Sequence, residues 1–317
     1  MFEKEDRWLR ETYVDLLIEY AHRDPRIVIL EADLSNAGGT KRFTAEFQGK
    51  RTVDCGIQEA NMIGVAAGMN AMGKIPFTHT FTPFATRRCC DQVTLSVAYA
   101  GLNVKMMGSD PGVTAEMNGG THMSMEDVSI MRNIPGITIF EPVDSVQLKA
   151  IFPQILASES PTYIRLLRRN AVKIWNDEEK FLLGKGKMIR EGRDVSIFAT
   201  GIEVAEAIKA ADALAAEGIS AEVINIHTIK PLDTEMILYS TKKTGAAVTA
   251  ENHSIIGGLG SAIAEELVDN HPVSLKRVGV ADHFGEVGKT DFLMKKYHLL
   301  AEDIMKAAKE AIAMKEN

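Results

Sequence analysis

The chain has 317 residues, of which 45% are hydrophobic and 25% are charged, with a formal net charge of −7. This composition is that of an ordinary globular protein of two domains, and the negative charge argues against nucleic acid as the main partner. No apolar run reaches the roughly 18 residues of a membrane span, and Met1–Arg7 has no signal-peptide core. We therefore expect no membrane partner, and the three cysteines favour a reducing, cytoplasmic location.

Strand-like runs alternate with helical patterns through the first half of the chain. The predicted strands are Arg26–Asp33, Ile75–Phe81, Asn103–Asp110, Ile137–Pro142 and Thr162–Leu167. The predicted helices between them are Glu59–Met72 and Phe84–Ala100. Such alternation is typical of a doubly wound α/β domain with a parallel sheet, which we place at residues 1–170.

A polar, glycine-punctuated stretch at residues 171–192 predicts a linker. Alternation then resumes in a second α/β domain, residues 193–317, with a mostly parallel sheet. Its predicted strands are Val195–Thr200, Ala221–His227, Ala246–Asn252 and Arg277–Ala281. Its predicted helices are Glu203–Glu217, one from near Leu232, one from near Gly260, and Ala301–Lys315.

Glu59 begins a helix of small apolar residues, close behind Ile57. A carboxyl group in apolar surroundings can exchange a proton with the ring nitrogen of a flat cofactor. The alternative is a solvated glutamate that completes a helix cap. Phe81 and Phe84 follow at a predicted strand end, where they could either flank such a ring or pack in the core.

A glycine-rich loop, Asn118–His122, follows the strand that ends at Asp110. Ligands of open α/β sheets bind at the carboxyl ends of strands, and histidine can move protons near neutral pH. The alternative is a structural loop. Three arginines after another strand could hold a phosphate or form surface ion pairs; they are Arg165, Arg168 and Arg169.

Several motifs occur in the order known from one enzyme family. They are Gly56-Ile57-Gln58-Glu59, Thr80-Phe81-Thr82-Pro83-Phe84, Asp91-Gln92-Val93 and Gly120-Thr121-His122. Over essentially its whole length the chain resembles the C-terminal half of transketolases, a pyrimidine-binding domain followed by the C-terminal domain. It is similar to the second subunit of a transketolase split between two genes. The resemblance implies ketol transfer from a ketose phosphate to an aldose phosphate with thiamine diphosphate.

The resemblance also implies roles for particular residues. Glu59 would be catalytic and contact N1′ of the aminopyrimidine, with Phe81, Phe84 and Ile57 lining its pocket. Asp33 would lie near the thiazolium across a dimer interface.

Further roles concern the sugar. The resemblance implies that His122 is catalytic and contacts substrate hydroxyls, and that Arg168 and Arg7 bind the phosphate. Three positions depart from the family pattern. Arg87 replaces a tyrosine near the cofactor, Asn118 replaces an acid that reads a donor hydroxyl, and Asp110 replaces a histidine near the phosphate. An acidic Asp110 would repel a phosphate beside it, so either the phosphate is held elsewhere or the substrate differs from pentose phosphates.

The Gly-Asp-Gly and Asn-Asn motif that binds the diphosphate through a metal in this family does not occur in the chain. The resemblance therefore implies an N-terminal partner subunit that holds Mg²⁺, Ca²⁺ or Mn²⁺ through oxygen ligands, in a heterotetramer. We predict no metal ligand in this chain. Two rival interpretations remain: the beta subunit of a 2-oxo-acid dehydrogenase, and a non-catalytic assembly subunit.

Overall fold

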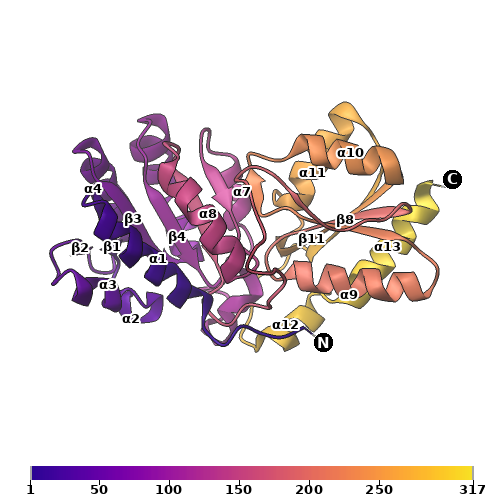
Figure 1. Cartoon of the computed structure of the whole chain (residues 1–317), viewed down its shortest axis with the longest axis horizontal. Helices are drawn as coiled ribbons and strands as arrows, with labels where there is room; N and C mark the ends of the chain where they lie inside the picture. The colour runs from indigo at the N-terminus through magenta and orange to yellow at the C-terminus, as the bar shows by residue number, and fades with distance from the viewer. Residues whose placement is uncertain (1, 316–317) are drawn as a thin grey trace.

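The chain folds around two sheets, each with helices on both faces (Figure 1). The structure is a computed structural model and describes residues 2–315. The two lobes lie side by side (Figure 1). The predicted arrangement of two α/β domains is confirmed.

The first sheet has seven strands in the order β10-β5-β6-β4-β3-β1-β2. Their bounds are Ile27–Glu31 (β1), Thr52–Asp54 (β2), Ile75–Phe81 (β3), Lys105–Ser109 (β4), Thr138–Phe140 (β5), Thr162–Leu166 (β6) and Thr228–Lys230 (β10). All neighbours are parallel except β10 and β5. Because β10 comes from the second half of the chain, it joins the two lobes through backbone hydrogen bonds.

The helices of the first lobe surround this sheet. They are α1 (Leu9–Arg23), α2 (Ser35–Gly38), α3 (Lys41–Glu46), α4 (Glu59–Ala71), α5 (Thr82–Ala85), α6 (Cys90–Gln92), a π-helix (Val93–Tyr99), α7 (Asp127–Arg132) and α8 (Ser145–Ala157). Short 3₁₀ segments cover Arg87–Cys89 and Gly112–Asn118.

The single helix predicted at Phe84–Ala100 is wrong, because this segment is broken into several turns. The Thr86 hydroxyl donates to the Thr82 carbonyl at 2.8 Å, and the Cys89 thiol donates to the Phe84 carbonyl at 2.9 Å. Side chains that bond to backbone carbonyls in this way compete with regular helical hydrogen bonds. The break decides where the arginines that follow Phe84 point.

The second sheet has five strands in the order β12-β11-β8-β9-β7. The strands are Lys187–Arg190 (β7), Val195–Ala199 (β8), Ala221–Asn225 (β9), Ala246–Ser254 (β11) and Ser274–Val280 (β12). The helices are Glu203–Ala216 (α9), Thr234–Thr244 (α10), Leu259–Asn270 (α11), Thr290–Lys296 (α12) and Ala301–Lys315 (α13). The stretch predicted as a linker, residues 171–192, contains β7 near its end. This strand pairs antiparallel with β9, so the last part of the stretch belongs to the second sheet.

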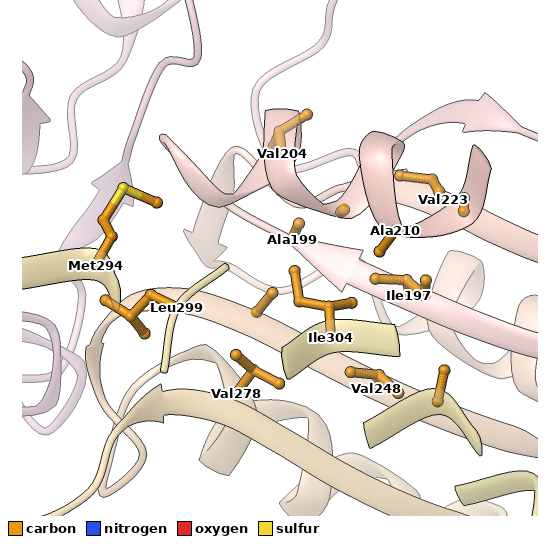
Figure 2. Close-up of a cluster of buried hydrophobic side chains, with 14 of the residues drawn as sticks. Ile197, Ala199, Val204, Ala210, Val223, Val248, Val278, Met294, Leu299 and Ile304 are labelled. Carbon is orange, nitrogen blue, oxygen red and sulfur yellow. The ribbon is translucent and has the colours of Figure 1, made fainter. Parts of the chain in front are cut away.

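Aliphatic side chains fill the space between the second sheet and the helices α9 and α13 (Figure 2). Ile197 and Val248 from the sheet, Ala210 from α9 and Ile304 from α13 are all fully buried. Burying one large aliphatic side chain contributes about 1.5–3 kcal/mol. This apolar core stabilises the second lobe.

No helix within residues 2–315 is both long enough and apolar enough to cross a membrane.

Candidate functional site

Several of the predicted site residues lie at the carboxyl ends of β3, β4 and β6, which are consecutive in the sheet order. Phe81 is the last residue of β3, Asp110 follows β4, and Arg168 lies shortly after β6. This is the edge at which open α/β sheets bind ligands.

Glu59 is the first residue of α4, and it is buried, with only 2% of its surface exposed. Arg88 Nη1 donates a hydrogen bond of 2.7 Å to Glu59 Oε2. Glu59 Oε1 has only a long contact of 3.5 Å from the Thr80 hydroxyl. The alternative of a solvated cap residue is therefore wrong: Glu59 is a buried carboxylate with one oxygen held by an arginine.

Three aromatic rings, of Phe81, Phe84 and His122, pack against one another at the end of β3. The ring centroids of Phe81 and Phe84 are 6.3 Å apart, and His122 lies 5.8 Å from Phe81 and 5.1 Å from Phe84. All three pairs are edge-to-face, a favourable arrangement for aromatic rings. The loop Asn118–His122 thus brings its histidine to the phenylalanine pair, as expected of a shared site.

Arg88 contributes to this group, and the sequence interpretation missed it. Its guanidinium carbon lies 3.8 Å from the centroid of the Phe84 ring, a cation–π contact. Arg87, which the sequence assigned to the cofactor, points elsewhere: its Nη1 donates to Glu126 Oε1 at 2.7 Å and its Nη2 to the Thr121 carbonyl at 3.4 Å. Arg87 therefore holds the histidine loop. The sequence signal was the position of Arg88, next to Arg87 and shortly after Phe84.

Asp110 and Arg168 form an ion pair at this edge, with 3.1 Å between Arg168 Nε and Asp110 Oδ2. Burial raises the pKa of Asp110 to about 6, although Arg168, Arg169 and Arg10 act to lower it. Arg10, on α1, is a second residue that the sequence interpretation missed. Burial lowers the Arg10 pKa, and the nearby positive charge of Arg168 lowers it further.

Arg7 does not join this cluster. Its guanidinium pairs with Asp15 at 2.8 Å, and 56% of the side chain is exposed. Arg10 lies further along the chain within α1, where its Nη1 bonds to the Ala37 carbonyl. The direction of the helix places Arg10, and not Arg7, next to the Asp110–Arg168 pair.

Three other predicted residues face solvent in the single chain. Ile57 is 72% exposed, and Asp33 and Asn118 are also exposed. Asp33 has a left-handed backbone with φ of 56°, and its N–H donates to Asp54 Oδ1 at 3.0 Å.

Arg165 has a structural role and is not placed to hold a phosphate. The side chain is fully buried, with Nε 2.7 Å from Asp127 Oδ2 and Nη1 2.6 Å from Glu141 Oε1. Its Nη2 donates to the Asn252 carbonyl of β11, at 2.7 Å. Burial is the largest influence on the pKa of Asp127 and acts to raise it, but the charges of Arg165 and His253 and the hydrogen bonds from Arg165 and Tyr163 together leave that pKa lowered. Arg165 therefore joins the two lobes.

Within the described residues, no group of three or more histidine, cysteine, aspartate or glutamate side chains is arranged to hold a metal ion.

Comparisons with known proteins match both lobes. Residues 7–173 match the family "Transketolase, pyrimidine binding domain", and residues 184–304 match "Transketolase, C-terminal domain". The chain is 66% identical to the 6-deoxy-6-sulfo-D-fructose transketolase subunit SqwH of Clostridium sp. (strain MSTE9), over 98% of this chain and 96% of that protein. It is 41% identical to the putative transketolase C-terminal section of Methanocaldococcus jannaschii, over 95% of each.

A solved structure described as "Split gene transketolase, inactive beta4 tetramer" superposes with a TM-score of 0.89. Its sequence is 40% identical, and the match covers 97% of this chain and 99% of that one. The predicted resemblance is confirmed: the chain belongs to the transketolase family and carries the family's pyrimidine-binding domain followed by its C-terminal domain, as a subunit of a split transketolase does.

Proposed function

We propose that this chain is the pyrimidine-binding subunit of a two-chain transketolase whose ketose donor ends in a sulfonate, with 6-deoxy-6-sulfo-D-fructose as the donor and an aldose phosphate as the acceptor. The choice of donor is supported by the 66% identity, over 98% of the chain, to a subunit that is named a 6-deoxy-6-sulfo-D-fructose transketolase subunit. We place the enzyme in the cytoplasm.

The residues present fit the pyrimidine half of thiamine diphosphate. A buried carboxylate, Glu59, has one oxygen held by Arg88 and the other only loosely contacted. The same Arg88 guanidinium lies over the ring of Phe84, which packs edge-to-face with Phe81. Glu59 would hold the aminopyrimidine at its ring nitrogen N1′, and the two phenylalanines would fix the plane of the ring.

When bound, thiamine diphosphate supplies the carbanion chemistry of ketol transfer. The chain's own residues would orient the sugar. His122 would give and take protons at substrate hydroxyls, because histidine changes charge near neutral pH. Arg168 and Arg10 would bind the anionic end of the sugar, for which guanidinium groups are suited.

A partner subunit would complete the site. The diphosphate and its Mg²⁺, Ca²⁺ or Mn²⁺ would be held by an N-terminal transketolase subunit, in a heterotetramer. Support comes from the split-gene relative, whose beta4 tetramer is described as inactive.

A second candidate donor is a ketose phosphate of the pentose phosphate pathway. It is favoured by the three arginines near Asp110, since arginine forks bind phosphate well. Two rival functions remain. The chain could be the beta subunit of a 2-oxo-acid dehydrogenase, which acts on a 2-oxo acid, or a non-catalytic assembly subunit, which has no substrate.

A donor screen on the reconstituted complex separates these candidates. The chain would be co-purified with its N-terminal partner and supplied with thiamine diphosphate, Mg²⁺ and glyceraldehyde 3-phosphate. We expect 6-deoxy-6-sulfo-D-fructose to be the best donor by kcat/KM. A higher kcat/KM for fructose 6-phosphate, or turnover of a 2-oxo acid alone, would overturn the proposal.

A further inference from the structure

We infer that Asp110 determines the donor preference. Its carboxylate, after β4, lies beside the arginines after β6, and the site they form together binds a monoanionic sulfonate more tightly than a dianionic phosphate. The inference rests on the proposed function, because it takes the far end of the ketose to lie beside Arg168. Asp110 is then a specificity-determining residue and takes no part in the chemistry.

The position of Asp110 is fixed by the backbone. The residue is fully buried and has a left-handed φ of 57°, a conformation that aspartate and asparagine adopt more readily than most residues. Its N–H donates to the Leu166 carbonyl at the end of β6, at 3.1 Å. The carboxylate is therefore held at the edge where Arg168 emerges and does not swing out to solvent.

The carboxylate is incompletely satisfied. Within residues 2–315, neither Asp110 oxygen has a hydrogen-bond partner, and the Arg168 Nε that lies 3.1 Å away has none either. A buried charged group without hydrogen bonds lowers stability. An acid kept under these conditions at the edge of a site calls for an explanation other than folding, and selection between ligands provides one.

The local charges favour a ligand with a single negative charge. The groups that act on Asp110 are Arg168 and Arg169 after β6, Arg10 on α1, and Glu116 in the 3₁₀ segment after β4. Arg169 is already paired with Glu116, at 2.6 Å. Counted with Asp110 itself, these groups are three arginines and two carboxylates, and with both acids ionised they carry one net positive charge that a monoanion neutralises.

Sulfonate and phosphate differ in this respect. A sulfonate is a strong acid and carries one charge, whereas a phosphate monoester carries about −1.5 to −2 at pH 7. The additional phosphate charge would lie near the Asp110 carboxylate, and the repulsion is strong because a buried site is poorly screened. A neutral or basic residue in this place would remove that repulsion.

The preference should also depend on pH. Burial raises the pKa of Asp110 to about 6, and the second pKa of a phosphate monoester is also about 6. Below this pH both groups lose charge, so the discrimination against phosphate should weaken as the pH falls through about 6. In a variant that lacks the Asp110 charge, the pH dependence of the discrimination should come only from the ionisation of the phosphate ester.

The test uses the complete two-chain enzyme and two donors that differ in their end group, 6-deoxy-6-sulfo-D-fructose and fructose 6-phosphate. The variants are Asp110→Asn, which keeps the shape and tolerates the left-handed backbone, and Asp110→His. Asp212→Asn is the matched control, because Asp212 pairs with Arg190 on the surface of the second lobe. Circular dichroism and gel filtration would confirm that each variant folds and assembles.

We expect the ratio of kcat/KM for the sulfonate donor to that for the phosphate donor to fall about tenfold in Asp110→Asn near pH 7.5, and further in Asp110→His. The change should lie mainly in KM for fructose 6-phosphate, and the pH dependence of the ratio should become shallower. The control should keep the wild-type ratio.

An unchanged ratio and pH profile in both folded variants would overturn the role of Asp110, while a wild-type preference for the sulfonate would leave the proposed function standing. A wild-type enzyme that prefers fructose 6-phosphate would instead refute the proposed donor, whatever the variants do.

Discussion

Arg88 and Glu59 form an ion pair of 2.7 Å at the start of α4, with the Glu59 carboxylate buried and the arginine 43% exposed. The arginine reaches the carboxylate from the broken segment that follows Phe84, and its guanidinium also lies over the Phe84 ring. One side chain thus fixes the carboxylate oxygen Oε2 and contacts one of the rings beside it. The pair gives the buried charge the partner that it needs and leaves Oε1 for a ligand.

Glu59→Gln tests whether this carboxylate is catalytic. The amide keeps the shape of the side chain but cannot exchange a proton, so we expect ketol transfer by the reconstituted complex to fall by about 10²-fold or more. Glu265→Gln, which changes an exposed carboxylate paired with Arg132, should keep full activity. Full turnover by a folded Glu59→Gln enzyme would favour a purely structural subunit.

Arg88→Gln should destabilise the isolated chain. Without the guanidinium, Glu59 stays buried with no cation, and we expect the free energy of unfolding in urea to fall by about 1–3 kcal/mol. Arg42→Gln is the control, since Arg42 pairs with Asp15 at the surface and should change stability by less than about 0.5 kcal/mol. Adding Glu59→Gln to Arg88→Gln should recover part of the loss, and strict additivity would show that the two side chains are not coupled.

Arg165→Met should weaken the junction of the two lobes. The change leaves Asp127 and Glu141 buried without their common cation, and the expected cost is about 3–5 kcal/mol of unfolding free energy. Urea denaturation followed by circular dichroism measures it, with Arg190→Gln at an exposed pair as control. Equal stability of the two variants would contradict the role assigned to Arg165.

Glu31 should make stability depend on pH. Burial raises its pKa from 4.5 to about 8, the hydroxyl of Thr40 opposes the shift, and the charge of Asp54 adds to it. The folded chain therefore binds more protons at this site than the unfolded chain, so the stabilisation present at low pH is lost as the pH rises from about 4.5 to about 8.

Glu31→Gln removes this ionisation. Relative to wild type, the variant should gain up to about 1.4 kcal/mol of unfolding free energy per pH unit across that window. Denaturation curves at several pH values measure the difference, and Glu19→Gln, at an exposed pair with Arg23, serves as control. Parallel curves for wild type and Glu31→Gln would show that the Glu31 pKa is not raised.

The isolated chain should bind thiamine diphosphate poorly. It presents Glu59 and the phenylalanines, while the proposed diphosphate and metal ligands belong to the partner. Calorimetry with thiamine diphosphate and Mg²⁺ should give a Kd at least about 100-fold weaker for the single chain than for the complex, a loss of about 2.7 kcal/mol. Tight metal-dependent binding by the chain alone would refute the divided site.

The sequence by itself determined the elements whose pattern is local. The strand Ile75–Phe81 and the helix Ala301–Lys315 have their predicted bounds, because hydrophobic periodicity and helix-end signals lie within the segments themselves. Glu59 could be singled out because a lone carboxylate at the start of an apolar helix stands out in the sequence.

Tertiary structure decided which of several similar side chains reach the site. Arg88 and not Arg87 meets Glu59, since the helix breaks after Phe84; Arg10 and not Arg7 lies near Asp110, since α1 directs it there. The strand β10 joins the first sheet from the second half of the chain, a pairing that no local pattern encodes. The physical reason is the same in each case: burial and ion pairing depend on contacts between distant segments, and these exist only once the chain has folded.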